Sequence, residues 1–312
     1  LIGLTKHLVP EMKIHLSTQA NAINSAALCM WHSLGVSRVV LARECSLEEI
    51  AEIRKNIPED LEIEAFVHGA MCMAHSGRCL LSSFLTGRDA NRGNCAQACR
   101  WKYSVCEETR PGEYFPLDET ENGTYIFNSK DLCMIEHIDE LVYAGISSFK
   151  VEGRVKTEYY VSCVAKAYRE AIDDVFDDLS LYKRNIPKYM AELLKTSHRD
   201  FSTGFYYGRP DASGQNYETS GYIRNYELIG AVRGYDYSRR LLETEQRNKF
   251  VAGDEIEIVE PGKEPETLVI TEMYGGDGKL ISAAPHAQMT VFIPFPHPVS
   301  RYGFIRRKKN DL

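Results

Sequence analysis

Five cysteines in the first half of the chain have a spacing that suits metal or redox chemistry. Cys72 and Cys79 form a C-x6-C pair, Cys95 and Cys99 form a C-x3-C pair, and Cys133 follows further along. Nine cysteines in 312 residues without a secretory signal are typical of a reducing compartment, where clustered thiols bind metal or react more often than they form disulfides. We therefore expect a cytoplasmic protein and not a disulfide-stapled one.

Spacing favours an iron–sulfur cluster over zinc. Structural zinc sites usually use tight C-x2-C knuckles, which this chain lacks. An iron–sulfur cluster requires four thiolates but accepts them from scattered loops. Cys72 and Cys133, predicted at the ends of neighbouring strands, would converge with Cys79 and Cys95 around one cluster, which leaves Cys99 as a spare or alternative ligand.

A nucleophilic cysteine is the competing interpretation, because His68 and His75 are near Cys72 in sequence and a thiolate needs a base. However, the spacing of papain-like or caspase-like sites is missing, and so are the H-E-x-x-H and G-x-S-x-G motifs. The residues thus give little support to protease chemistry.

Short apolar runs alternate with longer amphipathic segments, a pattern that predicts an α/β fold with a parallel sheet. Ser46 and Glu49 form a predicted capping box at the start of one helix. We expect strands over residues 13–18, 37–42, 61–69, 124–132 and 147–153, and helices over residues 20–35, 47–56, 135–144 and 157–175.

Polar side chains follow every predicted strand, and ligands of barrels and open α/β sheets bind beyond these carboxyl ends. Each pair taken alone would also suit a rim ion pair worth little. The candidate catalytic residues are His68, Lys130, Glu152 and Arg154. The candidate substrate-binding residues are Gln19, Asn21, Arg43, Glu44, Arg78, Arg88, Arg92 and Arg100.

The charge distribution allows a local nucleic-acid contact. The net charge of −7 disfavours a general electrostatic coat, but residues 78–102 carry five basic side chains against the single acid Asp89. A solvated loop with a chance excess of base would look the same. No apolar run approaches the roughly 20 residues of a membrane span, so we expect no membrane partner.

The predicted organisation has three parts. Residues 1–185 form a (β/α)8 TIM-like barrel with a cysteine-rich insert at 69–123, residues 186–219 form a connecting helix and linker, and residues 220–312 form a small all-β barrel. Five strands are too few to close the first barrel. Since the chain opens on Leu1, in what looks like a helix already under way, we expect further strands upstream.

The stretch EAFVHGAMCMAHSGRCLLS, residues 64–82, resembles the signature of peptidase family U32, the collagenase-type family. The pattern E-x-F-x-x-G-[SA]-[LIVM]-C is followed by G-x-C-x-[LIVM]-S, and both parts fit. FKVEGR at 149–154 and HRDFSTGFYYG at 198–208 resemble further blocks of the family. The resemblance extends over essentially the whole chain, which implies a barrel followed by the family's C-terminal β domain.

The resemblance implies chemistry other than proteolysis. Several members hydroxylate tRNA wobble uridine, a ribosomal RNA cytidine or ubiquinone precursors without oxygen, and carry a four-iron, four-sulfur cluster. The ligands of the ubiquinone branch map by motif onto Cys72, Cys79, Cys95 and Cys133. NCAQACRW at 94–101 and the C-terminal module resemble the tRNA branch, whose 5-hydroxyuridine synthesis is linked to prephenate.

These similarities imply a tRNA hydroxylase that binds tRNA, with Arg43, Lys130 or Arg154 holding the prephenate carboxylates. The alternatives are a collagenase-like peptidase, an rRNA cytidine hydroxylase, and an RNA-binding partner of a second family member.

Overall fold

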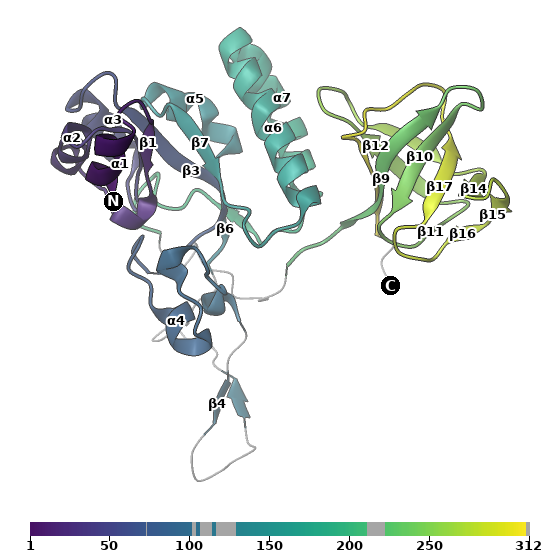
Figure 1. Cartoon of the computed structure of the whole chain (residues 1–312), viewed down its shortest axis with the longest axis horizontal. Coiled ribbons are helices and arrows are strands. Elements are labelled where there is room, and N and C mark those ends of the chain that lie inside the picture. Colours follow the sequence, from purple (N-terminus) through teal and green to yellow (C-terminus); the bar gives the residue numbers. More distant parts are fainter. Residues whose placement is uncertain (73, 102–103, 107–113, 117–128, 211–221, 310–312) are drawn as a thin grey trace. The chain divides into compact units, whose positions relative to one another are not determined.

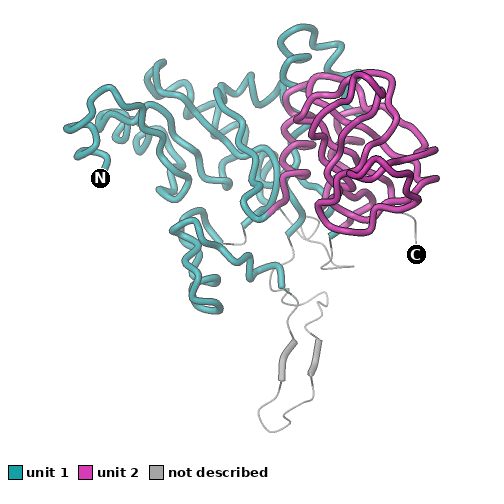
Figure 2. Tube along the Cα trace, turned by 45° about the vertical axis from the view of Figure 1, so that its right-hand side comes forward, with its two compact units in different colours: residues 1–155, 171–187, 198–222 teal, residues 156–170, 188–197, 223–312 magenta. Residues whose placement is uncertain are grey.

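The structure is a computed structural model that describes residues 1–72, 74–101, 104–106, 114–116, 129–210 and 222–309. Figure 2 shows two compact units, the first in teal and the second in magenta. Unit 1 comprises Leu1–Val155, Ala171–Pro187 and His198–Tyr222, and unit 2 comprises Lys156–Glu170, Lys188–Ser197 and Ile223–Leu312. Within the described residues, no helix has both the length and the apolar character needed to cross a membrane.

A six-stranded mixed sheet forms the centre of unit 1. Its strands β1 (Ile14–Leu16), β2 (Val36–Val40), β3 (Glu62–Ala70) and β7 (Ser148–Val151) are parallel, with β2 next to β1 and β3, and β7 next to β3. The side chains of β3 from Ile63 onward are buried, as expected for a central strand of a covered parallel sheet. Four of the five predicted strands are confirmed at these positions.

Helices accompany these strands as the sequence predicted. The capping box of Ser46 and Glu49 is present at the start of α3, where each side chain accepts the other residue's backbone N–H. Asn24 caps α2, which begins five residues later than predicted. The helical elements of the chain are α1 (Ile2–Leu8), η1 (Thr18–Ala20), α2 (Ser25–Ser33), α3 (Leu47–Lys55), α4 (Leu81–Thr86), η2 (Ala90–Arg92), η3 (Ala98–Arg100), η4 (Ile135–His137), α5 (Ile138–Tyr143), α6 (Glu158–Asp177) and α7 (Leu179–Leu193).

One strand runs opposite to the prediction. The strand β6 (Asp131–Cys133) lies antiparallel to β3, with Cys133 opposite His68, and β8 (Phe201–Ser202) pairs parallel to β6. The predicted residues 124–128 lie outside the described part of the chain. The chain leaves the sheet at the carboxyl end of β3 and re-enters it beside that same end. The strand β6 therefore runs back along β3. The α/β class is confirmed, whereas the described strands form an open sheet and do not confirm a barrel. A separate hairpin pairs β4 (Ser104–Cys106) with β5 (Tyr114–Pro116).

Unit 2 confirms the predicted all-β region. Eight strands pair in the order β13-β12-β18-β9-β10-β17-β14-β15, and β11 pairs with β16. Their inward side chains form one apolar core that includes Ile229, Phe250 and Ile305. The strands are β9 (Tyr226–Asp236), β10 (Leu241–Gln246), β11 (Phe250–Val251), β12 (Glu255–Val259), β13 (Glu266–Val269), β14 (Met273–Gly275), β15 (Leu280–Ile281), β16 (Ala283–Ala284), β17 (Thr290–Pro294) and β18 (Phe304–Lys308).

A buried arginine joins the helical segments of unit 2 to its sheet. Arg306 on β18 is completely buried and donates two hydrogen bonds to the Glu192 carboxylate at the end of α7, at 2.5 and 2.7 Å. Its Nε donates to Glu257 of β12 at 2.8 Å. Because a buried charge is tolerated only with such partners, these contacts fix the helix end to the sheet.

Candidate functional site

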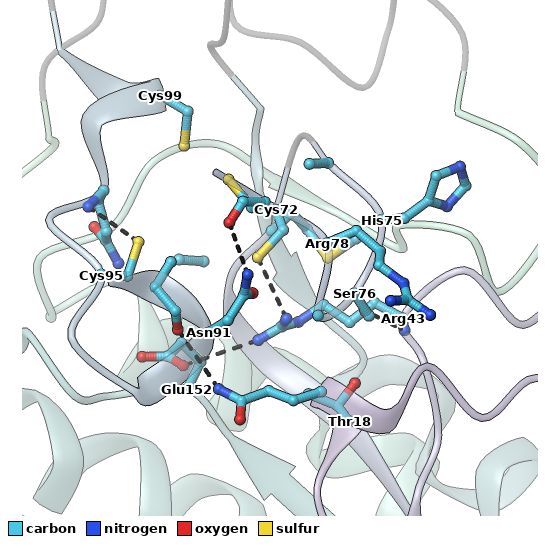
Figure 3. A pocket seen from close by; sticks show the side chains of 18 of the residues that line it. Thr18, Arg43, Cys72, His75, Ser76, Arg78, Asn91, Cys95, Cys99 and Glu152 are labelled. Atoms are coloured by element: carbon cyan, nitrogen blue, oxygen red, sulfur yellow. Dashed lines mark hydrogen bonds and ion pairs between the residues drawn. The ribbon is translucent and has the colours of Figure 1, made fainter. Parts of the chain in front are cut away.

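A cavity of about 420 Å³ lies at the carboxyl ends of the parallel strands, where the sequence predicted a polar site. The strands contribute Gln19 after β1, Arg43 after β2, and Glu152 and Arg154 after β7. The cysteine-rich segment, residues 69–101, forms the opposite wall. We call this space the first cavity, and Figure 3 shows its lining.

Four cysteines line the first cavity: Cys72, Cys79, Cys95 and Cys99. In Figure 3 the labelled Cys72 comes from one stretch of the segment, and Cys95 and Cys99 come from another. Burial raises the pKa of Cys72, Arg43 opposes this rise, and the thiols of Cys95 and Cys79 reinforce it. Burial likewise raises the pKa of Cys99 to about 11, opposed by Arg100 and reinforced by the other three thiols. The four thiols are therefore electrostatic neighbours in one cavity, and a metal centre bound there would take them as thiolates.

The four thiols of the first cavity match in number the ligands that a four-iron cluster requires. Four cysteine thiolates usually hold a four-iron cluster, and they surround a group of several atoms instead of meeting at one ion. Within the described ranges, no group of three or more His, Cys, Asp or Glu side chains is placed to hold one metal ion.

Cys133 is not among these four. It is buried in β6 opposite His68 and lines neither this cavity nor the neighbouring one. The prediction placed Cys133 at the carboxyl end of a parallel strand. Because β6 is antiparallel, its carboxyl end points away from the edge at which the cavity lies.

Arg43 is the central cation of the first cavity. Its guanidinium carbon lies 3.7 Å from the centroid of the Phe66 ring, and Nη1 donates to the Cys72 sulfur at 3.4 Å. Nη2 lies 3.8 Å from the Glu152 carboxylate, which also accepts the Arg154 amide at 3.0 Å. Stacking on the ring fixes the plane of the guanidinium, so Arg43 holds a thiol and a carboxylate in a defined relation.

A glycine allows the segment to approach the strand ends this closely. Gly77 has a φ of +73°, and a Cβ at this position would lie 2.3 Å from the Gln19 carbonyl oxygen. Only glycine tolerates both conditions. The glycine of the G-x-C motif therefore brings Cys79 up to the β1 end of the cavity.

A second cavity, of about 530 Å³, shares Cys72, His75 and Arg78 with the first one. Glu44 lines it, and its Oε1 accepts the Ser76 amide at 2.7 Å and lies 3.7 Å from His75 Nδ1. The other oxygen of Glu44 is buried and has no hydrogen-bond partner within the described part of the chain. This carboxylate can thus accept one more hydrogen bond.

Several predicted residues lie elsewhere. His68 is buried, with its ring centroid 5.5 Å from that of Phe201, and Lys130 lines neither cavity. Asn21 lines neither cavity and caps η1 in a left-handed conformation with a φ of +53°. Arg88 and Arg92 are exposed on the cysteine-rich segment outside both cavities.

Arg100 lines the first cavity, and its buried side chain also serves as an anchor. Its Nη1 donates to Asp131 Oδ1 at 2.7 Å, and Nη2 donates to the Met71 carbonyl at 3.4 Å. Because the side chain is only 5% exposed, Arg100 is not one of the exposed cations of the segment, and its role in substrate binding stays a prediction. Sequence spacing gave no sign of this pair, whose members are 31 positions apart.

Lys150 and Asn91 are two of the lining residues that were not predicted. Lys150 on β7 lines the first cavity and donates to Glu64 at 2.7 Å. Asn91 lines it as well and donates to the Cys79 carbonyl at 3.1 Å. Lys150 lies inside the FKVEGR block, two positions before Glu152, so the alternation of the strand was a signal that would have found it.

The fold and the site define an α/β domain with a cavity walled by cysteines, followed by an all-β domain. Residues 1–216 match the model of peptidase family U32, and residues 224–306 match that of the peptidase family U32 C-terminal domain. The chain belongs to peptidase family U32.

Relatives resemble the chain almost from end to end. It is 37% identical to tRNA hydroxylation protein P of Escherichia coli (strain K12), over 98% of this chain and 75% of that protein. It is 36% identical to tRNA hydroxylation protein P1 of Bacillus subtilis (strain 168), over 99% of this chain and 72% of the relative. A protein named Collagenase from Porphyromonas gingivalis (strain ATCC BAA-308 / W83) is 34% identical over 80% of this chain and 61% of its own length.

Proposed function

We propose that this protein hydroxylates the wobble uridine of tRNA and so forms 5-hydroxyuridine. The observation that carries the proposal is the similarity to two tRNA hydroxylation proteins across 98% and 99% of the chain, including the cysteine-walled cavity. The three exposed arginines of the cysteine-rich segment, Arg78, Arg88 and Arg92, suit an RNA phosphate backbone beside that cavity.

We propose that Cys72, Cys79 and Cys95 hold a four-iron, four-sulfur cluster together with a fourth cysteine. When bound, such a cluster supplies one-electron redox chemistry. The family resemblance favours Cys133 as the fourth ligand, whereas the position of Cys99 in the cavity wall favours Cys99. In either case Arg43 donates its hydrogen bond to Cys72, and this contact would compensate negative charge on the ligand.

The remaining cavity residues act on the substrates. Exchange of the C5–H of uridine for C–OH removes two electrons from the base and adds one oxygen atom. The reaction therefore requires an oxygen source that enters the site with the base, and an external redox partner that accepts the two electrons. Prephenate carries two carboxylates, and we assign these to Arg43 and Arg154, which both line the cavity, in preference to Lys130. Glu152 is the cavity carboxylate that would accept the C5 proton, and the Arg154 amide holds its Oε1 at 3.0 Å.

The decisive test is mass spectrometry of tRNA nucleosides from a deletion strain complemented with the full-length gene. Restored 5-hydroxyuridine, lost again in a prephenate-deficient background, is the expected result. Complementation that leaves the nucleoside absent overturns the proposal. Anaerobically purified protein should contain iron and sulfide at about four each per chain. Colourless, zinc-loaded protein with full activity would overturn the cluster assignment.

Two single variants identify the fourth ligand. Cys99→Ala should lower the iron content and abolish the absorbance of the cluster if Cys99 is the ligand, and Cys133→Ala should do so if Cys133 is. Cys29→Ala is the matched control, because Cys29 lies on α2 and lines neither cavity. Iron content equal to that of Cys29→Ala in both variants would mean that neither cysteine is required.

A peptidase is the second candidate, supported by the relative named Collagenase. The partner of the Cys72 sulfur is Arg43, which always carries its proton and cannot act as a general base. Hydrolysis of a peptide panel that survives both Cys72→Ala and Cys133→Ala would favour this candidate. Binding of tRNA without modification by cluster-loaded protein would instead indicate a subunit that acts with a second family member.

A further inference from the structure

Two aromatic side chains are exposed on the cysteine-rich segment next to the first cavity. Phe84 on α4 is 85% exposed, and Trp101, directly after η3, is 47% exposed. Leu80 is also exposed, and it lines the first cavity. Single exposed apolar residues are ordinary, but several within some twenty residues beside a cavity indicate a binding surface.

The two aromatic residues are held by a rigid scaffold. The Phe84 amide donates to the Leu80 carbonyl at 2.9 Å, so these side chains lie one helical turn apart on the same face of α4. Phe84 therefore extends, outside the cavity, the exposed apolar surface that Leu80 begins at its wall. The buried Ser82 accepts the Ala96 amide at 2.9 Å and ties α4 to the stretch that carries Cys95 and Cys99.

Cations stand among these apolar groups. Arg78, Arg88 and Arg92 are exposed, and Arg88 is positioned by the Asn94 side chain, which accepts from its Nε at 3.1 Å. Within the described residues of the segment Asp89 is the one acid. It caps η2 through the Asn91 amide at 3.0 Å. Exposed rings combined with a net positive charge suit unpaired nucleotides, because bases stack on aromatic faces while cations contact the phosphates.

We propose that Leu80, Phe84 and Trp101, with Arg78, Arg88 and Arg92, form a nucleotide rim that stacks the unpaired bases flanking the target base. This proposal rests on the proposed function, since it takes a single-stranded loop of tRNA as the ligand. A symmetric contact between two copies would place this basic surface against itself, so charge favours RNA over a second copy of this chain.

Binding of an unmodified anticodon stem-loop RNA to full-length protein tests the rim. Phe84→Ala and Trp101→Ala should each weaken binding about 5- to 100-fold, the range of one lost base–aromatic stack. Phe84→Tyr should restore binding and Phe84→Leu should not, because tyrosine keeps the ring face and leucine keeps only the apolar bulk. Tyr143→Ala is the matched control: Tyr143 is 96% exposed on α5 of the same unit, away from α4 in Figure 1.

Fluorescence gives a readout that does not depend on activity. The chain has two tryptophans, so Trp31→Phe leaves Trp101 as the single emitter, and the stem-loop should quench it more than a duplex of the same length does. Arg92→Gln should reduce by about one the slope of the logarithm of the RNA-binding constant against the logarithm of the salt concentration. The aromatic variants should leave this slope unchanged. Wild-type affinity in both Phe84→Ala and Trp101→Ala overturns the rim.

The outcomes separate the rim from the proposed function. If the aromatic and arginine variants change RNA binding as expected but no 5-hydroxyuridine forms, the proposed function fails and the rim stands. If tRNA is modified normally and the aromatic variants change neither binding nor modification, the rim fails and the function stands. A change in oligomeric state of Phe84→Leu or Phe84→Ala, without loss of RNA affinity, would assign the surface to a second copy and also overturn the rim.

Discussion

Replacement of Asp131 by Asn should destabilise unit 1 more than any single change on its surface. Asp131 is 1% exposed and accepts from Arg100 at 2.7 Å and from the Arg199 amide at 3.2 Å. Burial disfavours the Arg100 charge, but the Asp131 carboxylate outweighs this effect and holds the pKa of Arg100 above its ordinary value. Burial and repulsion from Arg100 lower the pKa of Arg199. One carboxylate thus serves two buried arginines.

The size of the effect follows from what remains after the change. Removal of one partner of a buried ion pair costs about 3–5 kcal/mol, because the other charge stays in the interior. For a unit of roughly 200 residues this corresponds to a fall in Tm of about 6–20 °C. Arg100→Met should cost less, since Asp131 then still has one arginine beside it and the repulsion between the two arginines is gone.

Tryptophan fluorescence during heating measures this stability, because Trp31 and Trp101 both belong to unit 1. Glu52→Gln is the control, since the Glu52–Lys55 pair is 68% and 73% exposed and worth at most about 1 kcal/mol. An Asp131→Asn protein that melts with the control, or an Arg100→Met protein that melts below Asp131→Asn, would refute the reasoning.

Three further predictions concern other buried groups. Burial opposes ionisation of Glu64, but the contact with Lys150 outweighs this effect and holds the pKa of Glu64 below its ordinary 4.5. The ionised Glu64 therefore stabilises the folded protein above pH 4.5, and this contribution is lost as the pH falls further. Glu64→Gln should therefore flatten the loss of the urea midpoint between about pH 5 and about pH 3. Arg306→Met should leave the Glu192 carboxylate without its arginine partner and lower the stability of unit 2 by about 3–5 kcal/mol. Hydrogen exchange of the β18 amides should become faster as a result. Burial raises the pKa of Cys45 to about 12, so only ~10⁻⁴ of this thiol is ionised at pH 8. Iodoacetamide at pH 8 should therefore label Cys45 only in denatured protein.

Local signals predicted the first part of the fold well. The capping box of Ser46 and Glu49 depends on residues three apart, and the residues of β3 form a short segment that is bounded by turn residues, as expected for a strand. The direction of β6 depends on its pairing with His68, some sixty residues away in sequence, and nothing in its own three residues specifies it. The prediction of a closed parallel barrel went beyond the local signals for this reason.

The difference between local signals and contacts distant in sequence also explains which site residues could be predicted. Position after a parallel strand located Arg43, Cys72 and Glu152 correctly in one cavity. It did not anticipate the antiparallel direction of β6, which leaves Cys133 outside the lining of that cavity. Composition counted Arg100 as a surface cation, because the partner that removes it from the surface, Asp131, is distant in sequence.

Arg100 also explains how one short segment can serve both the cavity and the surface. Its side chain fixes the segment to β6 through Asp131 and to the end of β3 through the Met71 carbonyl, while its neighbours Cys99 and Trp101 extend to the cavity and to solvent. A thiol and an aromatic ring two positions apart therefore gain fixed positions from the same anchor. If Cys99 holds the proposed cluster, loosening of that anchor in Asp131→Asn should weaken metal retention and RNA binding together, whereas Cys99→Ala and Trp101→Ala should each affect one of them. Independent loss of a single property in Asp131→Asn would contradict this coupling.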